Sequence, residues 1–284
     1  MIRIGMSTSC VFPLPLEEAF RLARTTGFDG IEIMVTDEKS TQDAGELRSL
    51  SQSYRMPILS VHAPVLIATQ LVWGLRPAVK LERSAELARA VGADTVVVHP
   101  PFRFQAGYAK RFERTVDALG ERYRVTLAVE NMFSWSVGGR DLRAYSPSPY
   151  PTDLDVRAMT LDFSHAALAG RDSLEFALAM GARLRHVHLC DGLGGTLLDE
   201  HLVPGHGSQP VSEVLGYLAS TGWTGSVVAE VHTHRARTTS HRLAILGETL
   251  DYARAAVAAP STRPSRAPGR ARALDVPDEP RSAR

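Results

Sequence analysis

The chain of 284 residues contains only two cysteines and three lysines, and it has no long apolar run. Cys10 and Cys190 are too few to form the disulfide framework of a small secreted protein. No signal peptide precedes the first predicted strand. No apolar stretch approaches the ~20 residues that cross a bilayer. We therefore expect a soluble, cytoplasmic protein with no membrane partner.

The sequence also lacks an excess of charge of one sign: basic and acidic residues nearly balance, and the net charge is +1. A nearly neutral chain has no field that would attract nucleic acid or an anionic membrane surface. Hydrophobic residues make up 44% of the sequence. With this length, such a fraction allows one α/β barrel or two smaller domains.

The last segment, residues 258–284, differs from the rest in composition. It combines five prolines with six arginines and only three acidic residues, so its net charge is +3 and the remainder carries −2. Such a segment has little to bury, which predicts a disordered tail after a single domain at residues 1–257. A basic arm for nucleic acid is the alternative, but the segment lacks aromatic residues and a longer charge run.

Short apolar runs alternate with amphipathic stretches along the whole domain, which is typical of strands and helices in turn. The predicted strands are Ile2–Met6, Gly30–Met34, Ile58–His62, Thr95–His99, Thr126–Glu130, Met159–Asp162, Leu184–Leu189 and Ser226–Glu230. The helical stretches include Leu16–Arg24, Val79–Val91, Ala109–Leu119, Val211–Ala219 and Leu243–Ala256. Gly27, Gly92 and Gly222 stand where helices should end. Eight such units in ~250 residues predict a (β/α)8 TIM barrel.

Ionisable residues stand in or at the end of seven of these strands. They are Glu32, His62, His99, Glu130, Asp162, His188 and Glu230. An ionisable side chain in a buried parallel strand is costly unless it is paired or bound to a metal. An open doubly wound sheet would gather such residues at one switch point. Their spread over the strands favours a closed barrel with its site at the C-terminal face.

Three further candidate ligands lie outside the strands. His165 follows Asp162 by three residues, and Asp199 and His201 belong to the longest interval between strand ends, 42 residues. The nine candidate ligands are therefore His62, His99, Glu130, Asp162, His165, His188, Asp199, His201 and Glu230. Imidazole and carboxylate together suit Zn or Mn, and also Co or Fe. Nine exceed the needs of one ion, so two or three ions bind or some residues act as bases or orient the ligands.

Other polar residues have simpler interpretations. We interpret Glu32 as forming a hydrogen bond at the rim, Asp191 as capping a loop, and His186 as pointing to the opposite face of its strand. Trp135, in the loop after Glu130, is a candidate for lining a substrate pocket, and His232 is a candidate substrate contact.

Eight short motifs, in order, carry a resemblance to a known family. They are Gly27-Phe-Asp-Gly30-Ile-Glu32, Val61-His62-Ala63-Pro64, Val98-His99-Pro100, Val129-Glu130-Asn131, Leu161-Asp162-Phe-Ser-His165, His188-Leu189-Cys-Asp191, Asp199-Glu-His201 with Gly205-His-Gly207, and Ala229-Glu230. Together they resemble the xylose-isomerase-like TIM barrel superfamily over residues 1–257. That superfamily includes sugar (phosphate) isomerases and epimerases, and abasic-site nucleases of the endonuclease IV type.

The resemblance to the epimerases implies a divalent metal held by Glu130, Asp162, His188 and Glu230. It implies that Glu130 and Glu230 exchange a proton next to a carbonyl through a metal-stabilised enediolate, while His165 holds a substrate hydroxyl. In the epimerases an arginine follows the strand-seven histidine by a few residues. This chain lacks it, which departs from the ketose-epimerase pattern.

The resemblance to endonuclease IV implies a trinuclear zinc site formed by all nine candidate ligands. The DNA-binding loops depart from that family: Val65 replaces an aromatic residue, and 132–136 replaces a glycine-rich loop. The −2 charge of the barrel also opposes phosphate binding.

We therefore predict a metal-dependent isomerase or epimerase with one to three ions, acting on a small polyhydroxylated carbonyl compound, phosphorylated or not. A zinc-dependent phosphodiesterase acting at abasic sites is the alternative. A barrel that binds sugar or metal without turnover is a third. The sequence gives no indication of the oligomeric state.

Overall fold

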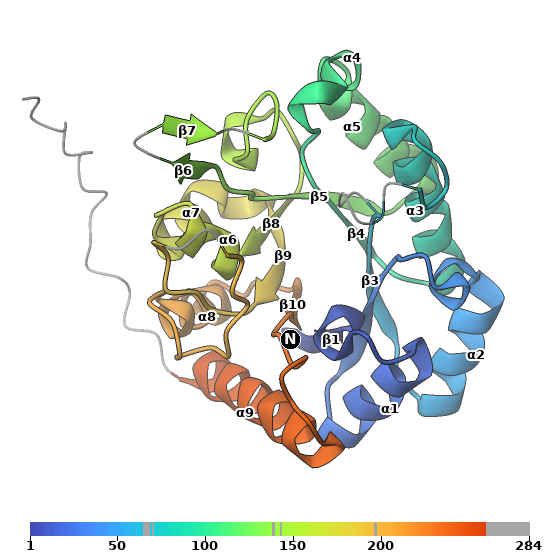
Figure 1. The fold of residues 1–284 in the computed structure, drawn as a ribbon, viewed down its shortest axis with the longest axis vertical. Helices are drawn as coiled ribbons and strands as arrows, with labels where there is room; N and C mark the ends of the chain where they lie inside the picture. Colours follow the sequence, from blue (N-terminus) through green and yellow to red (C-terminus); the bar gives the residue numbers. More distant parts are fainter. Residues whose placement is uncertain (65–68, 70, 138–139, 143, 196–197, 260–284) are drawn as a thin grey trace, which may run out of the picture.

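The computed structural model describes residues 1–64, 69, 71–137, 140–142, 144–195 and 198–259. Eight parallel strands in this part close into a barrel in the order β1-β10-β9-β8-β5-β4-β3-β2 (Figure 1). These strands are β1 (Arg3–Ser7), β2 (Gly30–Met34), β3 (Ile58–His62), β4 (Thr95–Val98), β5 (Thr126–Glu130), β8 (Met159–Asp162), β9 (Leu184–Leu189) and β10 (Ser226–Ala229). The TIM barrel prediction is confirmed.

The first strand closes the ring by pairing with a neighbour on each side. Arg3 of β1 lies opposite Ser226 of β10, and Gly5 of β1 lies opposite Gly30 of β2. This double pairing excludes the open sheet, in which an edge strand would have one partner. All eight predicted strands match the observed bounds to within one residue, because buried parallel strands are continuous apolar runs.

Helices surround the strands on the outside of the ring (Figure 1). They are α1 (Leu16–Thr26), α2 (Ala44–Tyr54), α3 (Pro77–Val91), α4 (Ala106–Ala109), α5 (Phe112–Tyr123), α6 (Phe163–Leu168), α7 (Ser173–Met180), α8 (Val211–Ser220) and α9 (Thr239–Ala258). Gly27 and Gly92 cap α1 and α3 with φ of 97° and 76°. These two predicted glycine stops thus supply the left-handed residue that ends each helix. At the third, Thr221 caps α8 and Gly222 follows it with a φ of 70°.

Two loops at the C-terminal ends of the strands are enlarged. The connection from β5 to β8 contains an antiparallel pair, β6 (Trp135–Val137) and β7 (Arg140–Leu142). The connection from β9 to α8 spans 190–210 and was expected from the long sequence interval. Both loops lie on the face where a TIM barrel carries its active site.

The predicted tail cannot be compared with the structure, because residues 260–284 lie outside the described residues. The last described helix, α9, ends at Ala258. Within the described part, no helix is both long enough and apolar enough to span a bilayer.

Gly30 stands where two strands approach too closely for any side chain. A Cβ atom there would lie 2.5 Å from Cγ of Leu59 and 2.7 Å from the carbonyl oxygen of Pro57.

We predict that Gly30→Ala lowers the free energy of unfolding by about 1–3 kcal/mol through overpacking. Gly247→Ala is the matched control in α9, where a Cβ meets nothing within 4 Å. It should stabilise by up to about 1 kcal/mol through helix propensity. Urea unfolding of both variants measures the difference, and a Gly30→Ala protein as stable as the wild type would contradict the packing argument.

Candidate metal centre

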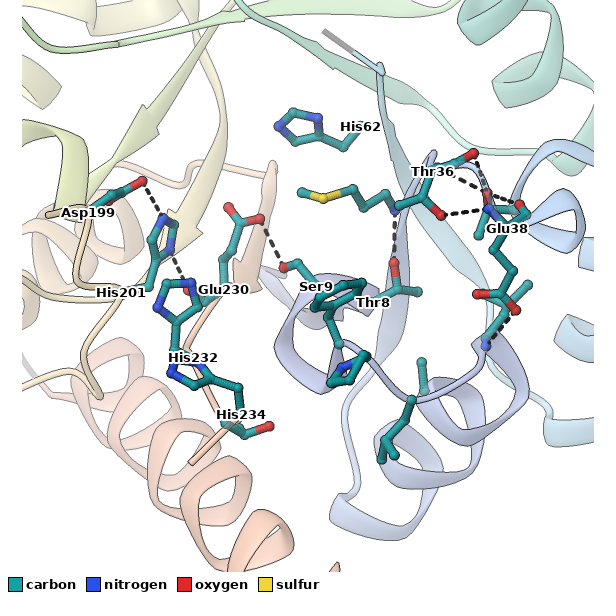
Figure 2. Close-up of a pocket in the computed structure, with 18 of the residues that line it drawn as sticks. Thr8, Ser9, Thr36, Glu38, His62, Asp199, His201, Glu230, His232 and His234 are labelled. Atoms are coloured by element: carbon teal, nitrogen blue, oxygen red, sulfur yellow. Dashed lines mark hydrogen bonds and ion pairs between the residues drawn. The ribbon is translucent and has the colours of Figure 1, made fainter. Parts of the chain in front are cut away.

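The C-terminal ends of the strands surround a cavity of about 690 Å³. Figure 2 shows part of this cavity, with Asp199, His201 and His232 on one side and Thr36 and Glu38 on the other. The predicted residues that line it are His62, His99, Glu130, His165, Asp199, His201, Glu230 and His232. Asp162 and His188 lie beneath them and are fully buried. The structure therefore brings all nine candidate ligands together, although their roles remain predictions.

Glu130, the last residue of β5, lies among four imidazoles. Its Oε2 is 2.9 Å from Nε2 of His99 and 3.5 Å from Nε2 of His62. Its Oε1 is 2.9 Å from Nδ1 of His188 and 3.3 Å from Nδ1 of His165. Burial raises the pKa of Glu130, but the nearby charges of His188 and His99 hold it well below its usual value. The carboxylate is thus ionised and can bind a cation.

His188 joins Glu130 to a second carboxylate, that of Glu230 just beyond β10. Nδ1 of His188 is 3.0 Å from Oε2 of Glu230 and 3.7 Å from Oδ2 of Asp162. Burial raises the pKa of Glu230, but the charge and hydrogen bond of His188 lower it to about 2. Ser9 donates a 3.0 Å hydrogen bond to Oε1 of Glu230. The ligand atoms of Glu130, Asp162, His188 and Glu230 all lie within 4.8 Å of one another.

His165, Asp199 and His201 form a neighbouring group. Oδ2 of Asp199 is 3.1 Å from Nε2 of His165 and 3.0 Å from Nε2 of His201. Asp162 caps the first turn of α6 by accepting a 2.7 Å hydrogen bond from the backbone N–H of His165. This cap explains why an Asp and a His three residues apart face one centre. Ser164 donates a 2.6 Å hydrogen bond to Oδ1 of Asp199 and fixes its orientation.

Asp191 organises the loop that carries Asp199 and His201. Its carboxylate accepts hydrogen bonds of 2.8 to 3.1 Å from four backbone N–H groups, those of Gly192, Gly205, Gly207 and Gln209. A Cβ atom at Gly207 would lie 2.2 Å from Oδ1 of Asp191, so this approach requires glycine. The interpretation of Asp191 as a loop cap is confirmed.

Two sequence interpretations were wrong. Glu32 does not lie at the rim: it is 0% exposed, and its Oε1 is 3.2 Å from Nε2 of His188. Ser60 donates a 2.7 Å hydrogen bond to its other oxygen. His186 does not face away from the site, since it is 0% exposed with Nε2 3.0 Å from Oε2 of Glu32. Residues 186 and 188 are two apart in one strand and therefore share a face.

The position of Glu32 determines how His188 can act. Nδ1 of His188 faces the carboxylates of the centre, while Nε2 faces Glu32. Burial lowers the pKa of His188, and the charges of Glu230, Glu130 and Glu32 more than offset this, raising it well above its usual value. A proton retained on Nε2 and donated to Glu32 leaves the Nδ1 lone pair for a metal.

The pocket-lining prediction for Trp135 cannot be assessed, because its side chain lies outside the described residues. His232 lines the cavity, with its ring centroid 4.9 Å from that of His201. Sequence reasoning missed Ser9, Ser164 and the orienting role of Asn131, whose carbonyl oxygen is 3.0 Å from Nδ1 of His165. Neutral polar residues give no signal of their own, although Ser164 and Asn131 both lie inside the motifs named above.

Known proteins with the same architecture identify the family of this chain. The pattern of the xylose isomerase-like TIM barrel family matches residues 20–256. The chain belongs to this family. An uncharacterized protein of Mycobacterium tuberculosis is 46% identical over 272 residues, covering 89% of this chain and 97% of that protein. Fructoselysine 3-epimerase of Escherichia coli O157:H7 is 21% identical, covering 82% and 91%.

Solved structures show the same xylose isomerase-like fold. A D-tagatose 3-epimerase-like protein superposes with a TM-score of 0.65 at 23% identity, covering 90% of this chain and all of that one. A xylose isomerase domain protein from Alicyclobacillus acidocaldarius gives a TM-score of 0.68 at 19% identity, covering 90% and 99%. At these identities the likeness establishes the fold.

The contribution of Glu32 to metal binding, through its contact with His188, can be tested by substitution. We predict that Glu32→Gln weakens binding of Mn²⁺ or Zn²⁺ about 10- to 100-fold, because His188 loses its anionic partner. Isothermal titration of the metal-free protein measures the affinity, and circular dichroism checks that the variant folds. Glu86→Gln, an exposed substitution in α3, is the control. Unchanged affinity would contradict the role of Glu32, and loss of one whole ion per chain would instead place an ion among Glu32, His186 and His188.

Proposed function

We propose that this protein is a divalent-metal-dependent sugar isomerase or epimerase that moves a proton at the carbon next to a carbonyl. The observation that carries the proposal is the pair of buried carboxylates, Glu130 and Glu230, at the floor of the cavity. A single imidazole nitrogen of His188 lies 2.9 Å from one and 3.0 Å from the other. They come from β5 and beyond β10, with β8 and β9 between them in the barrel. Two carboxylates on different strands can reach two sides of one substrate carbon.

The residues present fit a divalent cation. Three carboxylates and one imidazole offer ligand atoms within 4.8 Å of one another, and all four residues are buried. Oε2 of Glu130 is buried, and its 2.9 Å approach to Nε2 of His99 lacks the geometry of a hydrogen bond. Buried negative charge of this density is costly without a counter-charge. Glu130, Asp162, His188 and Glu230 would hold the ion, and the mixed oxygen and nitrogen ligands suit Mn or Zn.

A bound ion would act as a Lewis acid that polarises the substrate carbonyl. The chain's own residues move the proton. With a pKa of about 2, Glu230 is ionised and ready to accept a proton, but it is a weak base. The C–H bond must therefore be acidified for the transfer to proceed. Ser9 holds Oε1 of Glu230 at 3.0 Å and so orients the carboxylate, while Glu130 is placed to return the proton.

The relatives support this assignment. Fructoselysine 3-epimerase and a D-tagatose 3-epimerase-like protein are both named for the epimerisation of keto sugars. They cover 82% and 90% of this chain. His165 lines the cavity beside Glu130, where it can hold a substrate hydroxyl.

A second candidate is a phosphoesterase of the endonuclease IV type, which the additional ligand groups favour. His62 groups with Glu130 and His188, and His165 groups with Asp199 and His201. Together with the first group, they offer room for up to three ions. Paired ions stabilise both oxygens of a phosphoryl displacement. The −2 charge of residues 1–257 counts against a duplex DNA substrate.

The proton transfer can be tested directly. With Mn²⁺ and a panel of ketohexoses in D₂O, we expect the protein to exchange deuterium into the C–H next to the carbonyl, followed by NMR. Glu230→Gln should slow the exchange by about 10²- to 10⁴-fold, the usual contribution of a general base. Glu86→Gln should exchange like the wild type. Normal exchange by Glu230→Gln would show that the acid–base pair is assigned wrongly.

Metal content separates the two candidates. We predict one ion per chain for the isomerase, measured by elemental analysis after growth in defined metal. Close to three zinc ions per chain, together with nicking of duplex DNA at an abasic site, would establish the phosphoesterase instead.

A further inference from the structure

The cavity has two chemically different ends. Its inner end is the metal centre, and its outer end is formed by the loops after β1 and β2. Figure 2 shows Thr36 and Glu38 on this outer side, across the cavity from His201 and His232. Its apolar wall is made by Phe12, Pro13, Leu14 and Met34. Phe12 is 67% exposed, which leaves a large ring face free for a ligand.

The charged side chains of the outer wall are acidic. Asp37 and Glu38 both line the cavity, and no lysine or arginine lines it among the residues that the structure describes. Oε1 of Glu38 is engaged, since it accepts hydrogen bonds from the backbone N–H of Leu16 at 3.1 Å and from Oγ of Ser40 at 2.8 Å. Within the same described part, the Asp37 carboxylate has no hydrogen bond or ion pair. An exposed, unpaired carboxylate beside an apolar wall is complementary to a cation on an apolar stem.

We propose that the outer end of the cavity is a subsite for a substituent on the sugar, namely an apolar chain that ends in a protonated amine. The proposal rests on the proposed function, because the sugar itself occupies the inner end. It also excludes a sugar phosphate as the preferred substrate. A phosphate would bring up to two negative charges to a wall that already carries two carboxylates and, among its described residues, no lysine or arginine.

The size of the cavity agrees with a substrate larger than a free sugar. About 690 Å³ falls within the range of sites that enclose drug-sized ligands. Glu230, Ser9, Thr8 and Glu38 all line this one cavity, and Figure 2 shows Ser9 and Thr8 between the two glutamates. One extended molecule can therefore contact both ends.

The subsite can be tested with four ligands of one sugar series. The Mn²⁺-loaded full chain is titrated calorimetrically with D-fructose, D-fructose 6-phosphate, and 1-amino-1-deoxy-D-fructose carrying either a hexyl or a 6-aminohexyl group on its nitrogen. We expect the aminohexyl compound to bind at least tenfold more tightly than fructose, with the hexyl compound between them. The 6-phosphate should bind no more tightly than fructose.

Two variants show which residues of the outer end bind the substituent. Asp37→Asn should lower the affinity ratio of the aminohexyl to the hexyl compound several-fold, and Phe12→Ala should lower the ratio of the hexyl compound to fructose. Glu46→Gln removes an equal charge from α2, away from the cavity lining, and should leave both ratios unchanged.

The results distinguish failure of the subsite from failure of the proposed function. Tighter binding of the 6-phosphate than of fructose, or an aminohexyl preference unaffected by Asp37→Asn, would overturn the subsite alone. If the Mn²⁺-loaded protein binds none of the four compounds, the proposed function fails and the subsite fails with it.

Discussion

Buried negative charge at the centre of the barrel is the constraint on which the rest of the structure depends. Glu130, Asp162 and Glu230 are carried to one point by three strands, and Glu32 adds a fourth carboxylate beneath them. Such groups persist in an interior only when positive charge or hydrogen-bond donors surround them. His188 meets this need from both of its nitrogens, so one imidazole links the interior of the barrel to its mouth.

The loops extend this centre toward solvent. The Asp191 carboxylate gathers four backbone N–H groups and shapes the 190–210 loop, which in turn presents Asp199 and His201. His201 has a φ of 41°, an uncommon value for a residue with a side chain, and its Nδ1 lies 2.6 Å from the carbonyl oxygen of Glu230. That contact ties the loop to the end of β10 and sets the distance between neighbouring ligand groups.

Much of this site could be predicted because its ligands stand at strand ends, where apolar runs stop at an ionisable residue. The prediction failed where side-chain direction mattered. Only the closed barrel brings Glu32 of β2 beside His188 of β9. For His186, strand alternation alone places its side chain on the same face as that of His188, and the sequence interpretation overlooked this. Ser9 could not have been chosen from the sequence, since uncharged residues of short loops carry no pattern. Its role depends on a hydrogen bond to Glu230, 221 residues away in the chain.

The sequence by itself determined the eight strands, the glycine-terminated helices and the ring of ionisable residues, because periodicity and burial are local properties of a chain. Tertiary structure alone decided which of these residues share a centre, since β1 pairs with both β2 and β10 and so closes the sheet on itself. It also decided the character of the cavity. Closure sets the apolar and acidic loops after β1 and β2 opposite the histidines, and no local pattern encodes that distance.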